Sequence, residues 1–233
     1  MNNLYLYWEG NTRHWFYDLC LRTIRHHNPD VVVLGEKDVE DITGDKIPKF
    51  LDGACIPHRS DWIRKAVVHK AGGAWVDMDY CCWQSLDFLR SMSSDFDMVT
   101  WDQWDGATMD NFFAGRAGSK TLEAALQFIK TEFTAHRLHV GWLTASTIAS
   151  DKGLEANRWG RNIKIPTHMV SPYSYNSVDF FFSEQPMDDV SGHNGLGVMF
   201  SFHHFRDRLR GLTEKDILEG NLGISRIFQR ALQ

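Results

Sequence analysis

The sequence predicts a single α/β domain with a mostly parallel central sheet. Its 233 residues are enough for one domain with a substantial core. The chain opens with a strand, a helix and a second strand, an order that favours parallel pairing through a crossover. Strand and helix patterns then alternate to the end without a linker, repeat or low-complexity segment, so we expect one domain over residues 1–233.

The opening strand-helix-strand unit follows from local patterns. Residues 3–8 (NLYLYW) form an aromatic-rich strand, and residues 12–28 place apolar side chains at helical spacing. The pair Asn28-Pro29 ends this helix, and residues 30–35 (DVVVLG) have the composition of a short buried strand. Residues 39–57 are less regular and are expected to contain one short helix.

The middle of the chain predicts a second helix-strand pair. Ser60 is the expected N-cap of a helix over residues 61–71. The pair Gly72-Gly73 ends that helix, and residues 74–80 (AWVDMDY) form the next strand.

The remaining elements continue the alternation of strands and helices. They are strands over residues 96–102, 111–118 and 197–205, a strand and loop over 163–176, and helices over 119–136 (capped by Ser119), 141–153 and from Thr213 onward.

Composition excludes several classes of protein. The formal net charge is −5 and no basic patch is present, so no nucleic-acid partner is expected. The four cysteines form no C-x-x-C motif, and free thiols fit a reducing compartment. The N-terminus has no signal-peptide pattern and no run is long enough for a transmembrane helix, so the expected location is the cytoplasm.

Acidic residues around the second helix and its strand suggest a metal site. Asp61 and Arg64 lie three residues apart, which places them on one helix face, where a surface ion pair is the simpler interpretation. Asp77 and Asp79 lie two apart in the expected strand, so both side chains would share one face. Two carboxylates on one face repel each other unless a cation lies between them, and a divalent ion such as Mg²⁺ takes oxygen ligands.

The stretch SDWIRKAVVHKAGGAWVDMD, residues 60–79, resembles the signature S-D-x-x-R-x-x-x-L-x-x-x-G-G-x-Y-x-D-x-D of DXD-containing glycosyltransferases. These belong to the glycosyltransferase family 32 group, which includes capsular-polysaccharide transferases and mannosyltransferases, with the clostridial glucosylating toxins as distant relatives. Val68 replaces the usual Leu and Trp75 the usual Tyr. The clear resemblance covers residues 55–120.

The resemblance implies a GT-A (Rossmann-like) fold and a transferase that uses a nucleotide-diphosphate sugar with Mn²⁺ or Mg²⁺. In this group Asp61 and Arg64 would hold the donor sugar, with Arg64 also close to the diphosphate. Asp77 would contact ribose and sugar hydroxyls and reach the metal through water, and Asp79 would bind the metal directly. Physically, a metal that bridges two phosphates stabilises the departing nucleoside diphosphate, and an arginine adds bidentate positive charge.

The resemblance also implies roles for residues outside the central stretch. Asn111 in DNFFAG would make a polar contact close to the reacting carbon, or simply cap a strand. A C-terminal histidine would be a further metal or phosphate ligand, and FSFHHF offers His203 and His204 at a predicted strand end. Neighbours in a strand point to opposite faces, so one of the two, preferably His203, would serve. The usual His followed by Ser-Trp is absent.

Aromatic residues are unusually many, with nine Trp and 15 Phe. Flat rings can cover sugars or bases, but core packing is the simpler explanation. By the resemblance, Tyr7 and Trp8 at the end of the first strand would contact the nucleobase. The segment TWDQWDG, residues 100–106, is expected to be a loop that lines the sugar or acceptor pocket. Trp101 or Trp104 would be its platform, and Asp102 or Asp105 would make polar contacts or act as the acceptor base.

Three functions remain open from the sequence. The first is a glycosyltransferase with a glycan acceptor; retention of configuration and a UDP-sugar donor are the preferred options. The second is a phosphatase of the haloacid-dehalogenase type, in which the first Asp of D-x-D is the nucleophile; there the motif usually follows the first strand, whereas here it lies deep in the chain. The third is a non-catalytic relative that binds sugar.

Overall fold

A computed structural model describes residues 2–11, 13–136, 139–174 and 176–233. The chain divides into two compact units, each assembled from three separate stretches. The sheet unit comprises Met1–Glu9, Val31–Asp77 and Asp87–Ile165. The aromatic unit comprises Gly10–Asp30, Met78–Leu86 and Pro166–Gln233. That both units act as one domain stays a prediction.

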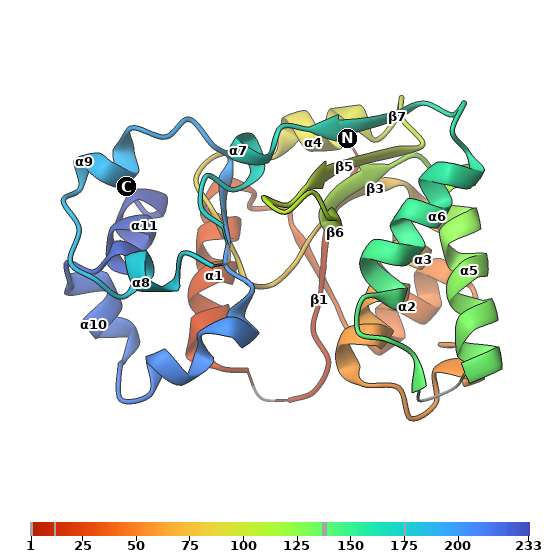
Figure 1. Cartoon of the computed structure of the whole chain (residues 1–233), viewed down its shortest axis with the longest axis horizontal. Coiled ribbons are helices and arrows are strands. Elements are labelled where there is room, and N and C mark those ends of the chain that lie inside the picture. The colour runs from red at the N-terminus through yellow and green to blue at the C-terminus, as the bar shows by residue number, and fades with distance from the viewer. Residues whose placement is uncertain (1, 12, 137–138, 175) are drawn as a thin grey trace. The chain divides into compact units, whose positions relative to one another are not determined.

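A six-stranded sheet organises the sheet unit, in the order β2-β1-β3-β6-β5-β7. Figure 1 labels its strands β1, β3, β5, β6 and β7. β1 is parallel to both β2 and β3, β5 is parallel to β7, and β6 is antiparallel to its two neighbours. The predicted α/β class with a mostly parallel sheet is therefore confirmed. The strands are β1 (Leu4–Tyr7), β2 (Val32–Leu34), β3 (Gly73–Val76), β5 (Met98–Asp102), β6 (Thr108–Gly115) and β7 (Asn162–Ile165).

Helices α3, α5 and α6 lie next to one another beside this sheet (Figure 1). Tyr5, Trp75 and Phe113 from the strands share one core cluster with apolar side chains of α3 and α5. The helices of the unit are α2 (Glu36–Thr43), α3 (Ile56–Ala71), α4 (Asp87–Met92), α5 (Lys120–His136) and α6 (Ala149–Ala156), with a 3-10 turn at Lys49–Leu51 and a π-helical turn at Thr144–Ile148.

The aromatic unit is built around phenylalanine rings. Phe16 of α1 stacks on Phe202 with ring centroids 5.2 Å apart, and Phe200 stacks on Phe228 at 5.5 Å. Most of the unusual phenylalanine content therefore packs a core, which was the simpler of the two expectations. The unit contains α1 (Trp15–His27), β4 (Tyr80–Cys82), α7 (Thr167–Val170), α8 (Val178–Phe181), α9 (Asp188–Ser191), β8 (Gly197–Met199), 3-10 turns at Phe202–His204 and Arg206–Leu209, α10 (Glu214–Glu219) and α11 (Gly223–Ala231).

The glycine pair after α3 is needed by its backbone. Gly72 ends the helix at φ 69° and Gly73 begins β3 at φ 114°, both left-handed values that favour glycine. A Cβ at Gly73 would also lie 2.6 Å from the carbonyl oxygen of Asn3. The pair thus lets β3 start directly against β1, as the sequence predicted for the end of this helix.

Two local predictions around the central helix and strand are wrong. The helix that carries Asp61 starts earlier than expected, with Cys55 as N-cap and Pro57 in its first turn, so Ser60 lies inside it. The expected strand over residues 74–80 is interrupted, because β3 ends at Val76 and a turn precedes β4. Asp77 and Asp79 therefore do not share the face of one strand.

The late strand is also shorter than expected. β8 ends at Met199, and Ser201 adopts a left-handed backbone at φ 50° that breaks the extended run. His203 and His204 consequently lie in a 3-10 turn, so the strand-alternation argument for preferring one of them does not apply.

Replacing Ser119 by Ala is expected to destabilise the protein by about 1 kcal/mol, whereas Ser60→Ala should be near neutral. The Ser119 hydroxyl accepts the Leu122 N–H at 3.2 Å and donates to the Asp97 carbonyl at 2.6 Å, as a buried N-cap of α5. Urea unfolding of the two variants measures the difference. Equal losses would show that Ser119 contributes nothing as a cap.

Candidate active site

The Arg64 guanidinium joins three carboxylates that come from three elements of the sheet unit. Its Nη2 donates to Asp77 at 3.0 Å and lies 3.0 Å from Asp61 Oδ1. Its Nη1 donates to Asp110 at 2.9 Å. The residues sit on α3 (Asp61 and Arg64), just after β3 (Asp77) and on β6 (Asp110), so packing α3 onto the sheet assembles the cluster. Asp61 and Asp77 thus share one donor nitrogen, and the surface ion pair considered from the sequence is instead a buried network.

Lys65 completes this network from the buried side. Its side chain is fully buried, donates to Asp110, and donates to the Ala145 carbonyl at 2.7 Å. Asp110 is 1% exposed, and it is the counter-ion of both Arg64 and Lys65. Buried charges are tolerated only when they are paired and hydrogen-bonded. Asp110 and Lys65 therefore fix the inner edge of the Arg64 guanidinium.

The two buried carboxyl groups of the network have opposite pKa shifts. Burial disfavours ionisation of Asp110, but Lys65 and Arg64 outweigh it and hold the Asp110 pKa below its usual value. Burial raises the pKa of Asp61, and Arg64 only partly offsets this effect. Asp110 is accordingly the ionised structural anion of the network.

Asp77 is held in place at both oxygens. The Trp75 indole N–H donates to Oδ1 at 2.8 Å, while Arg64 donates to Oδ2. The Asp77 backbone N–H also donates to the Asn111 carbonyl at 2.8 Å. Trp75 thus orients Asp77, the first aspartate of the D-x-D pair. Trp75 lies two residues before Asp77, and in extended backbone residues two apart point to the same side.

Asp79 and the paired histidines belong to the aromatic unit. The Asp79 carboxylate accepts the Phe202 backbone N–H at 2.9 Å, which places the His203-His204 turn next to it. Both histidines are exposed, and their ring centroids lie 4.1 Å apart. Burial, together with the neighbouring His203, lowers the pKa of His204, which favours the neutral imidazole that can bind a metal.

These donors have the right chemistry for a divalent cation. A half-buried carboxylate and exposed imidazoles are ligand types that Mn²⁺ or Mg²⁺ sites in proteins can use. Among the residues that the structure describes, however, no three or more His, Cys, Asp or Glu side chains form a group that could hold a metal ion. A metal site at Asp79 and one of the histidines therefore stays a prediction.

The expected base-contact residues differ in exposure. Tyr7 is 7% exposed and packs into the core of the sheet unit, and its hydroxyl donates to Glu9 at 3.1 Å. Burial, with Glu9 adding to it, raises the Tyr7 pKa. Trp8 is half-buried, and its backbone N–H donates to the Leu34 carbonyl at 3.0 Å. Tyr7 thus favours the packing alternative, and Trp8 is partly exposed.

Trp101 is not in a loop, which corrects the expectation for residues 100–106. It lies in β5, is 1% exposed, and donates its indole N–H to the Asn111 side-chain oxygen at 3.1 Å. Asn111 lies inside β6 rather than at a strand cap. Asp102 pairs with Lys164 at 2.6 Å. Of the proposed platform rings only Trp104, 51% exposed in the β5–β6 turn, is accessible.

Three of the four cysteines are buried and unsuited to act as nucleophiles. All four are free, and only Cys55 is exposed. Burial raises the pKa of the Cys82 thiol to about 12 and moves those of Cys20 and Cys81 in the same direction. Buried thiols of this kind stay protonated at neutral pH and are poor nucleophiles.

Sequence reasoning missed several charged residues near the strand ends. Lys65 adjoins the signature Arg64, and Asp110 adjoins Asn111, but nothing in their spacing indicates that they meet. Arg59 pairs with Glu9 at 3.0 Å and with Glu36 at 3.7 Å, which ties the starts of α2 and α3 to the end of β1. The one signal for Lys65 was its position four residues after Asp61, because this helical spacing places both side chains toward the same side of α3.

No protein-family model matches the sequence, and no curated protein matches it. Among solved structures, the chain is similar to the PaToxG glycosyltransferase with a TM-score of 0.46 and 11% sequence identity. The similarity covers 100% of this chain and 86% of that one. A likeness at this level does not assign a function, and the resemblance to the glycosyltransferase family 32 group stays a prediction. Within the described residues, no helix is long and apolar enough to cross a membrane.

Proposed function

We propose that this protein is a metal-dependent glycosyltransferase that moves a sugar from a nucleotide-diphosphate donor to a glycan acceptor. The observation that carries the proposal is the meeting of Asp61, Arg64 and Asp77 at one guanidinium. These are the residues at which the sequence resembles the DXD-containing transferases. The burial of Asp61 and Arg64, and the donor nitrogen of Arg64 that Asp61 and Asp77 share, are more than a surface ion pair needs.

The network can orient the donor through hydrogen bonds. The Asp61 and Asp77 carboxylates have acceptor capacity for sugar or ribose hydroxyls beyond the bonds that they make with Arg64 and Trp75. Arg64 supplies positive charge next to them, and Asp110 with Lys65 holds its inner edge. Such a prearranged set can fix substrate geometry without reorganising when the donor binds.

We assign the metal to Asp79 with His203 or His204. A bound Mn²⁺ or Mg²⁺ would stabilise charge on the departing nucleoside diphosphate. Trp8 is our candidate for the nucleobase contact, because it is partly exposed directly after β1. UDP as carrier and retention of configuration remain the preferred options.

The phosphatase alternative is disfavoured by the surroundings of Asp77. A nucleophilic aspartate needs an oxygen directed at the phosphorus atom. Here the Trp75 indole donates to one oxygen of Asp77 and Arg64 donates to the other. This arrangement suits an acceptor of hydroxyl groups better than an attacking group.

A thermal-shift panel of UDP-, GDP-, dTDP- and CMP-sugars, each with and without Mn²⁺, tests the proposal. A ligand that binds only the folded state raises its stability by RT ln(1 + [L]/Kd). We expect one diphosphate class to raise the Tm only with Mn²⁺. CMP-sugars carry a monophosphate and serve as the control.

Turnover separates an enzyme from a binding protein. The nucleotide-sugar that shifts the Tm should be hydrolysed slowly in the presence of Mn²⁺, releasing the nucleoside diphosphate. Binding without release of nucleotide, with or without glycan acceptors, would favour the non-catalytic alternative. No shift with any nucleotide at millimolar concentration would contradict the proposal.

A further inference from the structure

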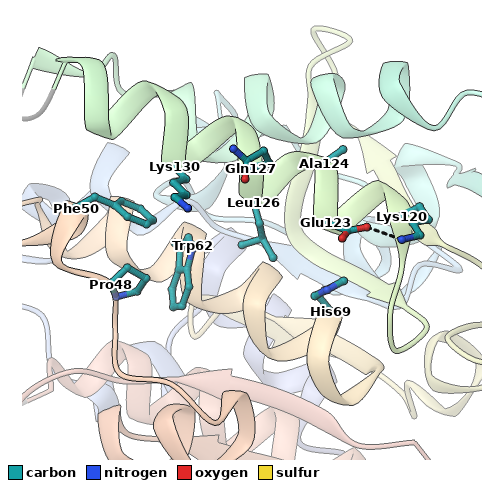
Figure 2. Close-up of a pocket in the computed structure, with 10 residues that line it drawn as sticks. All are labelled: Pro48, Phe50, Trp62, His69, Lys120, Glu123, Ala124, Leu126, Gln127 and Lys130. Carbon is teal, nitrogen blue, oxygen red and sulfur yellow. Dashed lines mark hydrogen bonds and ion pairs between the residues drawn. The ribbon is translucent and has the colours of Figure 1, made fainter.

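A groove runs between α3 and α5 on the sheet unit, and its described lining includes none of the residues of the Arg64 network. Figure 2 shows its lining, with Trp62 and His69 from α3 below and side chains of α5 above. Its volume is about 740 Å³. The lining residues are Pro48, Phe50, Trp62, His69, Lys120, Glu123, Ala124, Leu126, Gln127 and Lys130.

One end of the groove is apolar. Leu126 points down from α5 toward the Trp62 ring, and Phe50 and Pro48 flank the same end (Figure 2). Trp62 is 9% exposed, so its inner side belongs to the core while its remaining surface faces the groove. The side chains of Phe50 and Leu126 are only partly buried. This end can therefore take up an apolar group of moderate size.

Among the described residues that line the groove, the charges leave one cation beside this apolar end. Lys120 and Glu123 form an ion pair at 2.8 Å, and their charges cancel. Lys130 supplies the remaining formal charge, and its side chain extends toward Trp62 with Phe50 beside it (Figure 2). The His69 ring, at the other end, is held by its Nδ1 at 3.1 Å from the Ser119 carbonyl.

We propose that this groove binds a small amphipathic anion, with an aliphatic or aromatic body on Trp62 and Leu126 and a carboxylate on Lys130. The volume is within the range of about 300–1,000 Å³ that is usual for small-molecule pockets. An apolar wall with a few polar groups at its edge is the usual composition of such sites. The net positive charge of the described lining residues, supplied by Lys130 next to that wall, favours an anionic head group.

Octanoate is a suitable probe, with octan-1-ol as its uncharged counterpart. Isothermal titration calorimetry of the full chain should show saturable binding of octanoate, at least about tenfold tighter than octan-1-ol. Lys130→Met should weaken octanoate about tenfold and leave octan-1-ol unchanged, because only the charged head group loses its partner. Lys70→Met, an exposed lysine on α3 outside the groove, is the matched control and should change neither affinity.

Filling the groove tests the location independently. Leu126→Trp adds bulk at the apolar end and should abolish binding of both probes. Circular dichroism verifies that this variant is folded, and if it is not, Lys130→Met alone decides. The proposal is overturned if octanoate does not bind saturably, if it binds Lys130→Met as tightly as the unmodified protein, or if a folded Leu126→Trp variant still binds it.

Discussion

An Asp79→Asn variant is expected to lose Mn²⁺-dependent turnover of the nucleotide-sugar by more than about 100-fold, since removing even an outer-shell partner of a metal typically costs 10–100-fold. The substitution removes the negative charge that would bind the metal but keeps an oxygen. That oxygen can still accept the Phe202 N–H, so the turn that carries His203 and His204 should be retained. Initial rates as a function of Mn²⁺ concentration measure the effect.

The control for Asp79→Asn is Asp41→Asn. Asp41 is an exposed carboxylate of α2 that pairs with Lys37 at 2.8 Å, and it has no assigned role with the donor, the acceptor or the metal. Its replacement should leave the Mn²⁺ dependence unchanged. Equal Tm values for the Asp79 variant and the unmodified protein would show that the loss is not due to unfolding. Full activity of Asp79→Asn would refute the metal assignment.

An Asp110→Ala variant is expected to lose about 3–5 kcal/mol of unfolding free energy, because it leaves the buried Lys65 ammonium without its carboxylate. Arg64 loses its Nη1 partner at the same time. Typical domains have only about 5–15 kcal/mol in total, so this loss would lower the urea midpoint strongly. Urea unfolding followed by circular dichroism measures it.

Two further variants test whether the loss of stability comes from the unpaired buried charge of Lys65 or from the loss of any ion pair. Asp102→Ala removes a partly exposed pair and should cost no more than about 1 kcal/mol. A Lys65→Met, Asp110→Leu double variant removes both charges and should recover much of the loss of Asp110→Ala. If Asp110→Ala costs no more than Asp102→Ala, the network does not contribute to stability as we infer.

Much of the fold could be predicted because its signals are local. Ser119 caps α5 as expected, and the glycine pair Gly72-Gly73 ends α3 where the sequence placed the end. Alternating strands and helices gave the α/β class. Errors arose where a single residue changes the backbone, as with Ser201, whose left-handed conformation ends the extended run before the histidines.

The candidate site could be predicted only in part. Asp61, Arg64 and Asp77 meet, as their arrangement in the signature implies. Asp110, in contrast, lies 45 residues from Lys65, and the contact depends on how β6 pairs with its neighbours. The register of β5 and β6 shifts between Val99 and Trp101, so simple alternation could not show which way Asp110 points. Trp101 was expected in a loop because Asp and Gly residues follow it closely, but β5 continues to Asp102.

The buried network also changes how an Arg64→Ala variant must be interpreted. From the sequence, loss of donor affinity would indicate a role in the site, and unfolding would indicate an ion pair. Arg64 contacts three carboxylates and is 5% exposed, so its removal is expected to affect both properties. The variants of Asp110 and Lys65 show how far a loss of stability alone weakens donor binding. Donor binding by Arg64→Ala therefore has to be compared with donor binding by these variants.

The interleaving of the two units has a consequence for synthesis of the chain on the ribosome. The sheet unit is complete once Ile165 has emerged, whereas the aromatic unit waits for its last stretch, Pro166–Gln233. Until then β4 lacks its partner β8, and Phe16 lacks Phe200, Phe202 and Phe228. A nascent chain therefore carries an exposed aromatic helix, α1, through most of translation, and this helix is where a chaperone would bind or premature aggregation would begin.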